Sequence, residues 1–184
     1  MPDLFDLGRI GAGLPVAETI DRLPGLLSGR RTLVVQAPPG TGKTTLVPPA
    51  LHNHTGGKVL VTAPRRVAVR AAARRLAHLD GSQLGERVGF TVRGEHHPGS
   101  LVEFMTPGVL LRRLMSDPEL PGVAAVAVDE VHERQLDTDL VLGMLLELVQ
   151  LREDLTVAAM SDSDFWVSST LTGFSRFSRS RHSA

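Results

Sequence analysis

The chain has 184 residues, 42% of them hydrophobic, which suits one well-buried core and is too short for two ordinary domains. Its 20 basic and 20 acidic residues cancel, so overall charge gives no reason to expect a nucleic-acid partner, and a reason must come from local clustering. The absence of cysteine excludes disulfides and thiolate metal sites, and it favours a cytoplasmic location.

The sequence contains neither a secretory signal nor a segment that could span a membrane. Charged residues are scattered through residues 1–20, which therefore lack the apolar centre of a secretory signal. The most apolar helical stretch, residues 140–151, contains Glu147 and is too short to cross a bilayer. We therefore expect no membrane association.

Two kinds of segment alternate along most of the chain. Short apolar runs rich in β-branched residues are typical of buried parallel strands, and the alanine- and leucine-rich stretches between them have helical spacing. The predicted strands are residues 32–36, 58–62, 101–105, 124–128 and 155–160. The predicted helices are residues 43–52, 66–78, 108–115 and 139–151. This order predicts an α/β fold, a doubly wound and mostly parallel sheet with helices on both faces. An amphipathic segment over residues 14–27 suggests a helical lead-in, residues 1–30, before the first strand.

The segment APPGTGKT, residues 37–44, follows the first predicted strand and begins the first predicted helix, as a Walker A phosphate loop requires. Its glycines allow backbone N–H groups to face inward, and the helix N-terminus adds a positive dipole end. Lys43 is placed to reach the β- and γ-phosphates, and Thr44 to bind Mg²⁺. Ala37 stands where the strict pattern has glycine, but ordinary backbone angles suffice there. The alternative is a Gly/Pro-rich turn without a ligand. The predicted nucleotide-binding residues are Gly40, Thr41, Gly42, Lys43, Thr44 and Thr45.

An acidic motif follows the predicted strand 124–128, in the sequence DEVHER, residues 129–134. Ligands of a doubly wound sheet lie outside the carboxyl ends of its strands, so Asp129 is expected beside the phosphate loop. Its carboxylate suits Mg²⁺, a hard cation, and Glu130 is then placed to orient and deprotonate the attacking water. The alternative is an acidic helix N-cap within a solvated run of charges.

The densest basic patch of the chain is a group of arginines at the start of the second predicted helix. A surface of this kind is suited to bind nucleic-acid phosphates. The alternative is an ordinary solvated helix whose arginines cover apolar surface. The residues of this basic patch are Arg65, Arg66, Arg70, Arg74 and Arg75.

Several segments in order over about residues 14–161 resemble the DEAH-box helicases of superfamily 2, and within them the bacterial HrpB-type group. Besides the phosphate loop, TAPRR at 62–66 looks like motif Ia, and VGFTVR at 88–93 looks like the family's VGYxVR element. MTPGVLLR at 105–112 resembles motif Ib, and DEVHER, continuing to Thr138 and Asp139, resembles motif II. Ordered matches of this kind are far more specific than a lone phosphate loop.

The resemblance implies an ATP-dependent helicase whose RecA-like P-loop domain spans residues 31–161, uses ATP and Mg²⁺, and moves on single-stranded RNA or DNA. Catalytic roles then belong to Lys43, Glu130 and His132, the histidine coupling the nucleotide to the rest of the motor. An isolated histidine at a helix start is otherwise often structural. Contacts to the nucleic-acid backbone belong, by resemblance, to Arg65, Arg66, Thr106 and Gly108.

The chain departs from the family after Ser161, where Asp162 and Ser163 replace the Ala-Thr of motif III. Residues 162–184 have no helical or strand period, so we predict an irregular tail and hypothesise that it is translated out of frame. The family's second RecA-like domain, which supplies arginine fingers, is not found in this sequence. Because such a finger accelerates hydrolysis by about 10³–10⁵, we expect slow turnover from this chain alone.

Two other functions fit parts of the sequence. A nucleotide-dependent RNA-binding or regulatory module without turnover would use the same phosphate loop. A small P-loop kinase would too, but Arg65, Arg66 and the DEVH segment have no role there. The histidines lack a supporting ligand pattern, so we expect no structural metal beyond Mg²⁺. The choice between RNA and DNA stays open.

Overall fold

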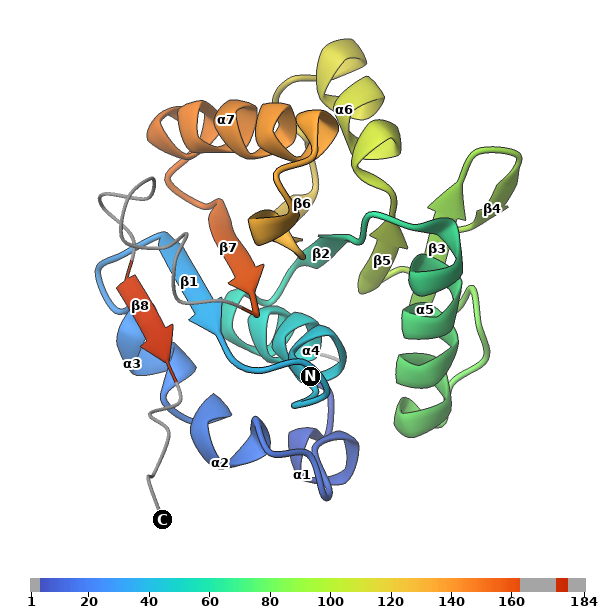
Figure 1. The fold of residues 1–184 in the computed structure, drawn as a ribbon, viewed down its shortest axis with the longest axis vertical. Helices are drawn as coiled ribbons and strands as arrows, with labels where there is room; N and C mark the ends of the chain where they lie inside the picture. The colour runs from blue at the N-terminus through green and yellow to red at the C-terminus, as the bar shows by residue number, and fades with distance from the viewer. Residues whose placement is uncertain (1–3, 163–174, 179–184) are drawn as a thin grey trace.

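The computed structural model describes residues 4–162 and the backbone of residues 175–178. An eight-stranded sheet in the order β4-β3-β5-β2-β6-β7-β1-β8 forms its centre (Figure 1). Neighbouring strands are parallel, apart from the antiparallel pair β3 and β4. The strands are β1 Thr32–Gln36, β2 Lys58–Thr62, β3 Val88–Val92, β4 Glu95–His97, β5 Val102–Met105, β6 Val123–Val128, β7 Thr156–Ser161 and β8 Ser175–Ser178.

Helices cover both faces of the sheet, as the sequence predicted. The apolar side chains of α1 to α5 pack on one face, and those of α6 and α7 pack on the other (Figure 1). The helices are α1 Leu7–Ile10, α2 Ala17–Ile20, α3 Leu23–Leu27, α4 Lys43–Thr55, α5 Arg66–Asp80, α6 Pro107–Ser116 and α7 Leu136–Leu151. Among the described residues, none of these helices combines the length and the apolar character needed to span a bilayer. The fold is therefore the expected doubly wound α/β arrangement.

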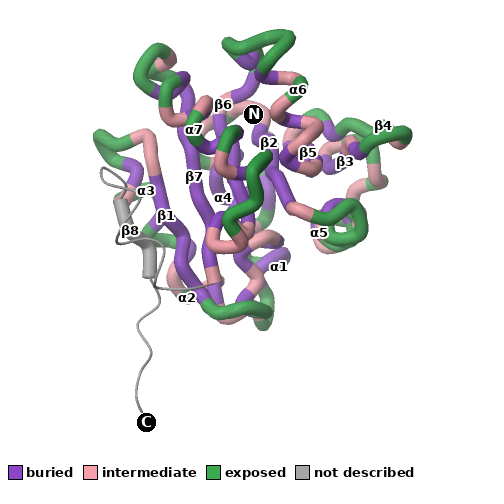
Figure 2. Tube along the Cα trace, turned by 45° about the horizontal axis from the view of Figure 1, so that its top comes forward, coloured by how far each residue is buried: buried purple, intermediate pink, exposed green. Residues whose placement is uncertain are grey.

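The inner strands of the sheet are mainly apolar because both of their faces are covered. In β1, Leu33 and Val35 join the core under α1 to α5, whereas Val34 joins the core under α6 and α7. The central strands are buried along nearly their whole length, and most exposed residues lie in helices, connections and the outer strand β4 (Figure 2). This burial explains why the sequence shows continuous apolar runs instead of alternation.

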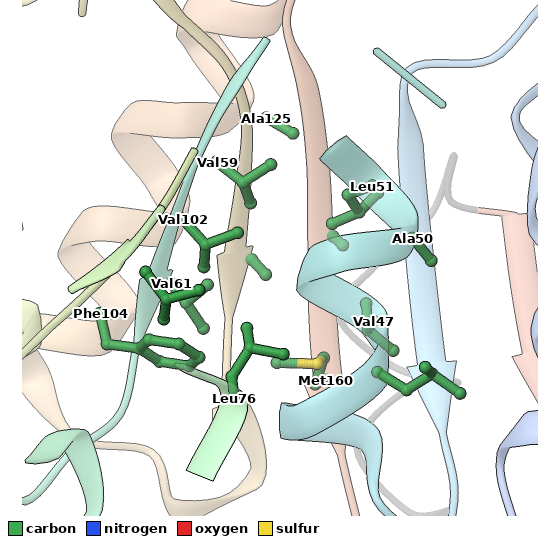
Figure 3. Close-up of a cluster of buried hydrophobic side chains, with 14 of the residues drawn as sticks. Val47, Ala50, Leu51, Val59, Val61, Leu76, Val102, Phe104, Ala125 and Met160 are labelled. Atoms are coloured by element: carbon green, nitrogen blue, oxygen red, sulfur yellow. The ribbon is translucent and has the colours of Figure 1, made fainter. Parts of the chain in front are cut away.

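The core under α4 and α5 fixes the helix that carries the phosphate loop. Val47 and Leu51 of α4 and Leu76 of α5 belong to one buried cluster with Phe104 of β5 and Met160 of β7 (Figure 3). These five side chains are fully buried, and each contributes about 1.5–3 kcal/mol relative to exposure. The N-terminus of α4 is therefore held rigidly against the sheet.

Three regions of the fold differ from the prediction. Strands β3 and β4 form a hairpin where the sequence indicated no strand, because Gly89 interrupts the apolar run. A Cβ atom at Gly89 would lie 2.0 Å from the carbonyl oxygen of His97, so the close approach of the hairpin requires glycine. Helix α7 begins at Leu136, earlier than the predicted residue 139. The lead-in contains three short helices, of which α2 and α3 lie in the predicted amphipathic segment.

Within the expected irregular tail, residues 175–178 form the edge strand β8, paired in parallel with β1. This short strand differs from the expectation, because its four residues carry too little pattern to be recognised as a strand. Residues 163–174 and 179–184 lie outside the described residues, and so does most of the segment to which the out-of-frame hypothesis applies.

Candidate nucleotide site and nucleic-acid interface

The predicted phosphate loop connects β1 to α4 and is shaped by two glycines. Gly40 and Gly42 have φ angles of +76° and +93°, in the left-handed region that favours glycine. A Cβ atom at Gly42 would lie 2.8 Å from Leu14 Cδ1, so the lead-in segment leaves no space for a side chain. The N–H of Val16 donates to the carbonyl of Thr41 at 3.0 Å. The lead-in therefore supports the loop from behind.

The loop presents its donors to an anion. Helix α4 starts directly after Gly42, so its free N–H groups and positive dipole end face the loop. No acidic residue in its first turn offsets this positive end. Lys43 is 6% exposed, and its Nζ donates to the carbonyl of Ala37 at 2.9 Å. Ala37 thus performs a backbone role that needs no glycine, and the departure from the strict Walker A pattern leaves the loop intact.

A hydrogen bond joins the phosphate loop to the acidic motif. Thr44 Oγ1 donates to Asp129 Oδ2 at 2.6 Å, and the N–H of Glu130 donates to Asp129 Oδ1 at 2.9 Å. Asp129 is only 4% exposed, and burial raises the pKa of its carboxyl despite the hydrogen bonds from Thr44 and Glu130. A buried carboxylate beside a threonine hydroxyl fits a hard cation, which would relieve the cost of burying the charge.

Glu130 stands at a strained turn next to Asp129. Its φ of +57° is in the left-handed region, and Arg134 at the other end of the 3₁₀ turn Val131–Glu133 has a φ of +53°. Burial, followed by the charges of Asp129 and Asp162, raises the pKa of the Glu130 carboxyl. A carboxylate with a raised pKa is a better proton acceptor near neutral pH.

His132 faces Glu130 with one ring nitrogen and the end of β7 with the other. The N–H of Asp162 donates to His132 Nδ1 at 3.3 Å, and Ser161 Oγ lies 3.4 Å from the same nitrogen. With Nδ1 as the acceptor, a neutral ring would carry its proton on Nε2, and this nitrogen lies 3.2 Å from Glu130 Oε2. His132 therefore links the acidic motif to the strand where the family's motif III begins.

Asp162 also reaches the phosphate loop. Its Oδ1 forms an ion pair with Lys43 Nζ, and its side chain is 21% exposed. Sequence reasoning assigned no role to Asp162, because the contact joins two residues far apart in the chain and no pattern marks it.

A cavity of about 710 Å³ opens beside these groups. One end is acidic and includes the carboxyl groups of Asp129, Glu130 and Asp162, whereas the other is lined by small apolar residues of α5. Glu130, His132 and Glu133 offer ligand atoms within 4.8 Å of one another at this acidic end. The cavity is large enough for the phosphate end of a nucleotide and opens toward the basic patch, since Arg65 and Arg75 also line it.

Comparison with known proteins places this geometry in a family. The model of the DEAD/DEAH box helicase family matches residues 18–161. The chain belongs to this family. It is 41% identical over 155 residues to the ATP-dependent RNA helicase HrpB of Escherichia coli strain K12, a match that covers 82% of this chain and 19% of that protein. It is also 38% identical over 160 residues to the human probable ATP-dependent RNA helicase DHX34, covering 86% of this chain and 14% of that protein.

The solved structures support the same assignment. A crystal structure of the Escherichia coli DEAH/RHA helicase HrpB matches with a TM-score of 0.77 at 41% identity, over 83% of this chain and 20% of that one. The resemblance to DEAH-box helicases and the RecA-like α/β fold are thereby confirmed. The chain spans about a fifth or less of the length of these relatives.

The helicase domain brings its predicted nucleic-acid residues together at the ends of two adjacent strands. Strands β2 and β5 pair in register, and the N–H of Ala63 donates to the carbonyl of Met105 at 3.0 Å. Thr106 follows β5 directly and Arg65 comes three residues after β2, so both lie beyond the carboxyl ends of these neighbouring strands. Thr106 precedes α6, where Gly108 is partly exposed in the first turn.

The basic patch of the helicase domain divides into fixed and available arginines. Arg65 is 72% exposed, but its Nη2 bonds Glu133 Oε1 at 2.9 Å and so connects this edge to the acidic motif. Arg70 Nη2 pairs with Glu95 Oε2 of β4 at 2.7 Å. Within the described part of the chain, the exposed guanidinium groups of Arg66 and Arg74 form no hydrogen bond or ion pair. These two arginines are free to bind phosphates, whereas Arg70 has a structural partner.

Proposed function

We propose that this helicase domain binds ATP with Mg²⁺ and couples nucleotide hydrolysis to movement on a single strand of RNA. The observation that carries the proposal is the 2.6 Å hydrogen bond between Thr44 and Asp129, since it joins the two residues that hold a magnesium nucleotide in P-loop NTPases. The names of the relatives, both RNA helicases, favour RNA over DNA.

Phosphate binding follows from the groups that already line the loop. The inward N–H groups of the loop and of the first turn of α4 would donate to phosphate oxygens, and Lys43 would add a charge-assisted bond. Thr44 and Asp129 would hold Mg²⁺, which supplies neutralisation of the charge on the transferring phosphoryl group. The buried position of Lys43 and Asp129 strengthens both interactions, because surrounding apolar atoms exclude water.

Hydrolysis needs a base for the attacking water, and Glu130 is the group we assign. Its backbone bond to Asp129 fixes it next to the metal ligand, and its raised pKa suits proton acceptance. His132 Nε2 lies 3.2 Å from Glu130 Oε2, and a proton on this nitrogen would orient that carboxylate. This contact supports the coupling role of His132, because the same ring also meets the end of β7.

Strand recognition would use the exposed edge beside β2 and β5. Arg65 and Arg66 would bind backbone phosphates, and Thr106 with Gly108 would approach the same strand at the start of α6. The ion pair between Arg65 and Glu133 supports coupling between the sites, since an RNA phosphate competing for Arg65 would release Glu133 beside Glu130.

Calorimetry with Mg²⁺-ATP, together with phosphate release measured with and without single-stranded RNA, tests this function on the chain as it exists. We expect stoichiometric ATP binding that disappears without Mg²⁺, and slow hydrolysis that RNA accelerates. Nucleotide-dependent RNA affinity without any phosphate release would instead support a regulatory binding module. Phosphoryl transfer to a small acceptor would support a kinase, and an absence of ATP binding would refute the proposal.

A further inference from the structure

Asp162 occupies a position set by the sheet. It is the first residue after β7, and the N–H of Ala37 donates to the carbonyl of Ser161 at 3.2 Å, which ties the end of β7 to the start of the phosphate loop. Ser161 is fully buried, and the N–H of Asp162 donates to His132 Nδ1 at 3.3 Å. With Ser161 and its own N–H anchored in this way, Asp162 extends its carboxylate into the nucleotide site.

The carboxylate of Asp162 binds Lys43, the side chain that the phosphates of a nucleotide would need. Lys43 Nζ has three N–H donors, and it already contacts Ala37 O at 2.9 Å and Pro38 O at 3.4 Å. The ion pair with Asp162 Oδ1 uses the remaining donor direction. A phosphate approaching Lys43 must therefore displace a carboxylate that carries the same sign of charge.

The neighbours of Asp162 identify which phosphate it would displace. Asp162 lines the cavity together with Thr44, Asp129, Glu130 and His132. Thr44 and Asp129 are the proposed Mg²⁺ ligands, and Glu130 is the proposed base for water attack, so this end of the cavity is where the terminal phosphate belongs. Burial first, then the charges of Asp129 and Asp162, raise the pKa of Glu130, so the Asp162 carboxylate acts on the same end of the cavity.

We propose that Asp162 is an affinity- and specificity-determining residue whose carboxylate occupies the γ-phosphate position on Lys43 and competes with the triphosphate. The inference rests on the proposed nucleotide binding and adds a selectivity to it. ATP must break the Lys43–Asp162 ion pair and bring its terminal charge beside Asp162, whereas ADP presents only its β-phosphate to Lys43 and places no γ-phosphate beside Asp162. The family motif has alanine at this position, so the competing carboxylate is a feature of this chain.

The test compares ATP and ADP affinities of the full chain with those of Asp162→Ala and Asp162→Asn by calorimetry. If the ion pair forms in about nine molecules of ten, its removal raises ATP affinity about tenfold, since only the open fraction binds. The gain for ADP should be smaller. Asp162→Asn keeps the size and backbone contacts of the residue, so it preserves the measurement if Asp162→Ala fails to fold.

Asp154→Asn is the matched control. It also removes one negative charge, but Asp154 is exposed and pairs with Arg152, away from the phosphate loop. We expect this variant to bind ATP and ADP as the parent chain does. An unchanged ATP affinity in both Asp162 variants, a weaker one, or an equal gain for ADP and ATP would each overturn the inference. If neither the parent chain nor any of the variants binds ATP, the proposed function itself is refuted.

Discussion

Two regions beyond the carboxyl ends of the strands meet at the acidic motif and are built differently. We call them the nucleotide edge, formed by the phosphate loop and Asp129, and the nucleic-acid edge, formed by the residues that follow β2 and β5. On the nucleotide edge, Lys43 and Asp129 are buried. Lys43 Nζ bonds the carbonyl of Ala37, and the Asp129 carboxylate accepts from Thr44 and from the N–H of Glu130. On the nucleic-acid edge, beside β2 and β5, Arg65 and Arg66 are exposed. Arg65 Nη2 forms an ion pair with Glu133 Oε1 of the acidic motif at 2.9 Å, and this contact connects the two edges.

This difference follows from what each edge has to recognise. A magnesium triphosphate is small and highly charged, so pre-oriented donors in a water-poor site gain most from rigidity. A nucleic-acid backbone is long and repetitive, and exposed arginines bind it through many weak, salt-dependent contacts. Single substitutions should therefore have large effects on the nucleotide edge and small ones on the nucleic-acid edge.

The largest effect is expected from Lys43→Ala. The substitution removes the one buried cation of the phosphate loop and leaves Asp162 unpaired beside two other carboxylates. We expect ATP affinity to fall by at least about 100-fold in calorimetry, as for loss of a strong bond to a charged group. Arg74→Ala, which removes an exposed positive charge from α5, is the control and should bind ATP normally. Unchanged ATP affinity in Lys43→Ala would contradict the assignment of the phosphate loop.

The next effect separates binding from chemistry. Glu130→Gln keeps the size of the side chain and the backbone bond to Asp129, so ATP affinity should change by less than about twofold. Hydrolysis should fall by about 10²–10⁴-fold, because the amide cannot accept the proton of the attacking water. Single-turnover phosphate release measures the rate. If the rate of Glu130→Gln equals that of the parent chain, another group is the base.

The sequence was sufficient for the parts of these edges that depend on local chemistry. The glycine-dependent turn of the phosphate loop and the apolar strand before Asp129 are local features. The structure contains both, the turn with positive φ at Gly40 and Gly42. Parallel-sheet topology then accounts for why two distant motifs meet, because the carboxyl ends of β1 and β6 share one side of the sheet.

The sequence was insufficient where a residue depends on a distant partner. Gly89 looks like a strand breaker until the backbone of His97 is placed 2.0 Å from its would-be Cβ atom. Asp162 looks like a departure from motif III until β7 delivers it to Lys43. Neither the pairing of Arg65 with Glu133 nor the free state of Arg66 can be inferred from spacing along one helix.

A smaller effect is expected on the nucleic-acid edge from Arg66→Ala. Removing one phosphate contact should weaken binding of single-stranded RNA by about fivefold to tenfold at 0.1 M salt and lower the slope of log affinity against log salt by about 1. Fluorescence anisotropy over a salt series measures both. The control is Arg22→Ala, an exposed arginine before α3 and away from this edge. An equal loss in both variants would indicate nonspecific attraction instead of a defined contact.

The smallest effect, and the finest test of the nucleic-acid edge, comes from Gly108→Ala. An added Cβ would lie 3.1 Å from Asp137 Oδ2, the end of an exposed side chain that is able to move aside. Thermal unfolding should therefore show a stability change within about 0.5 kcal/mol. If an RNA strand approaches the backbone of Gly108 as proposed, the methyl group should still reduce RNA affinity by about twofold to threefold, while ATP affinity stays constant. Gly143→Ala, within α7 and with open space around its would-be Cβ, is the matched control and should leave RNA affinity unchanged. If the folded Gly108→Ala variant binds RNA as tightly as the parent chain, Gly108 does not contact RNA. Of the residues predicted at the start of α6, only Thr106 would then remain as a candidate contact.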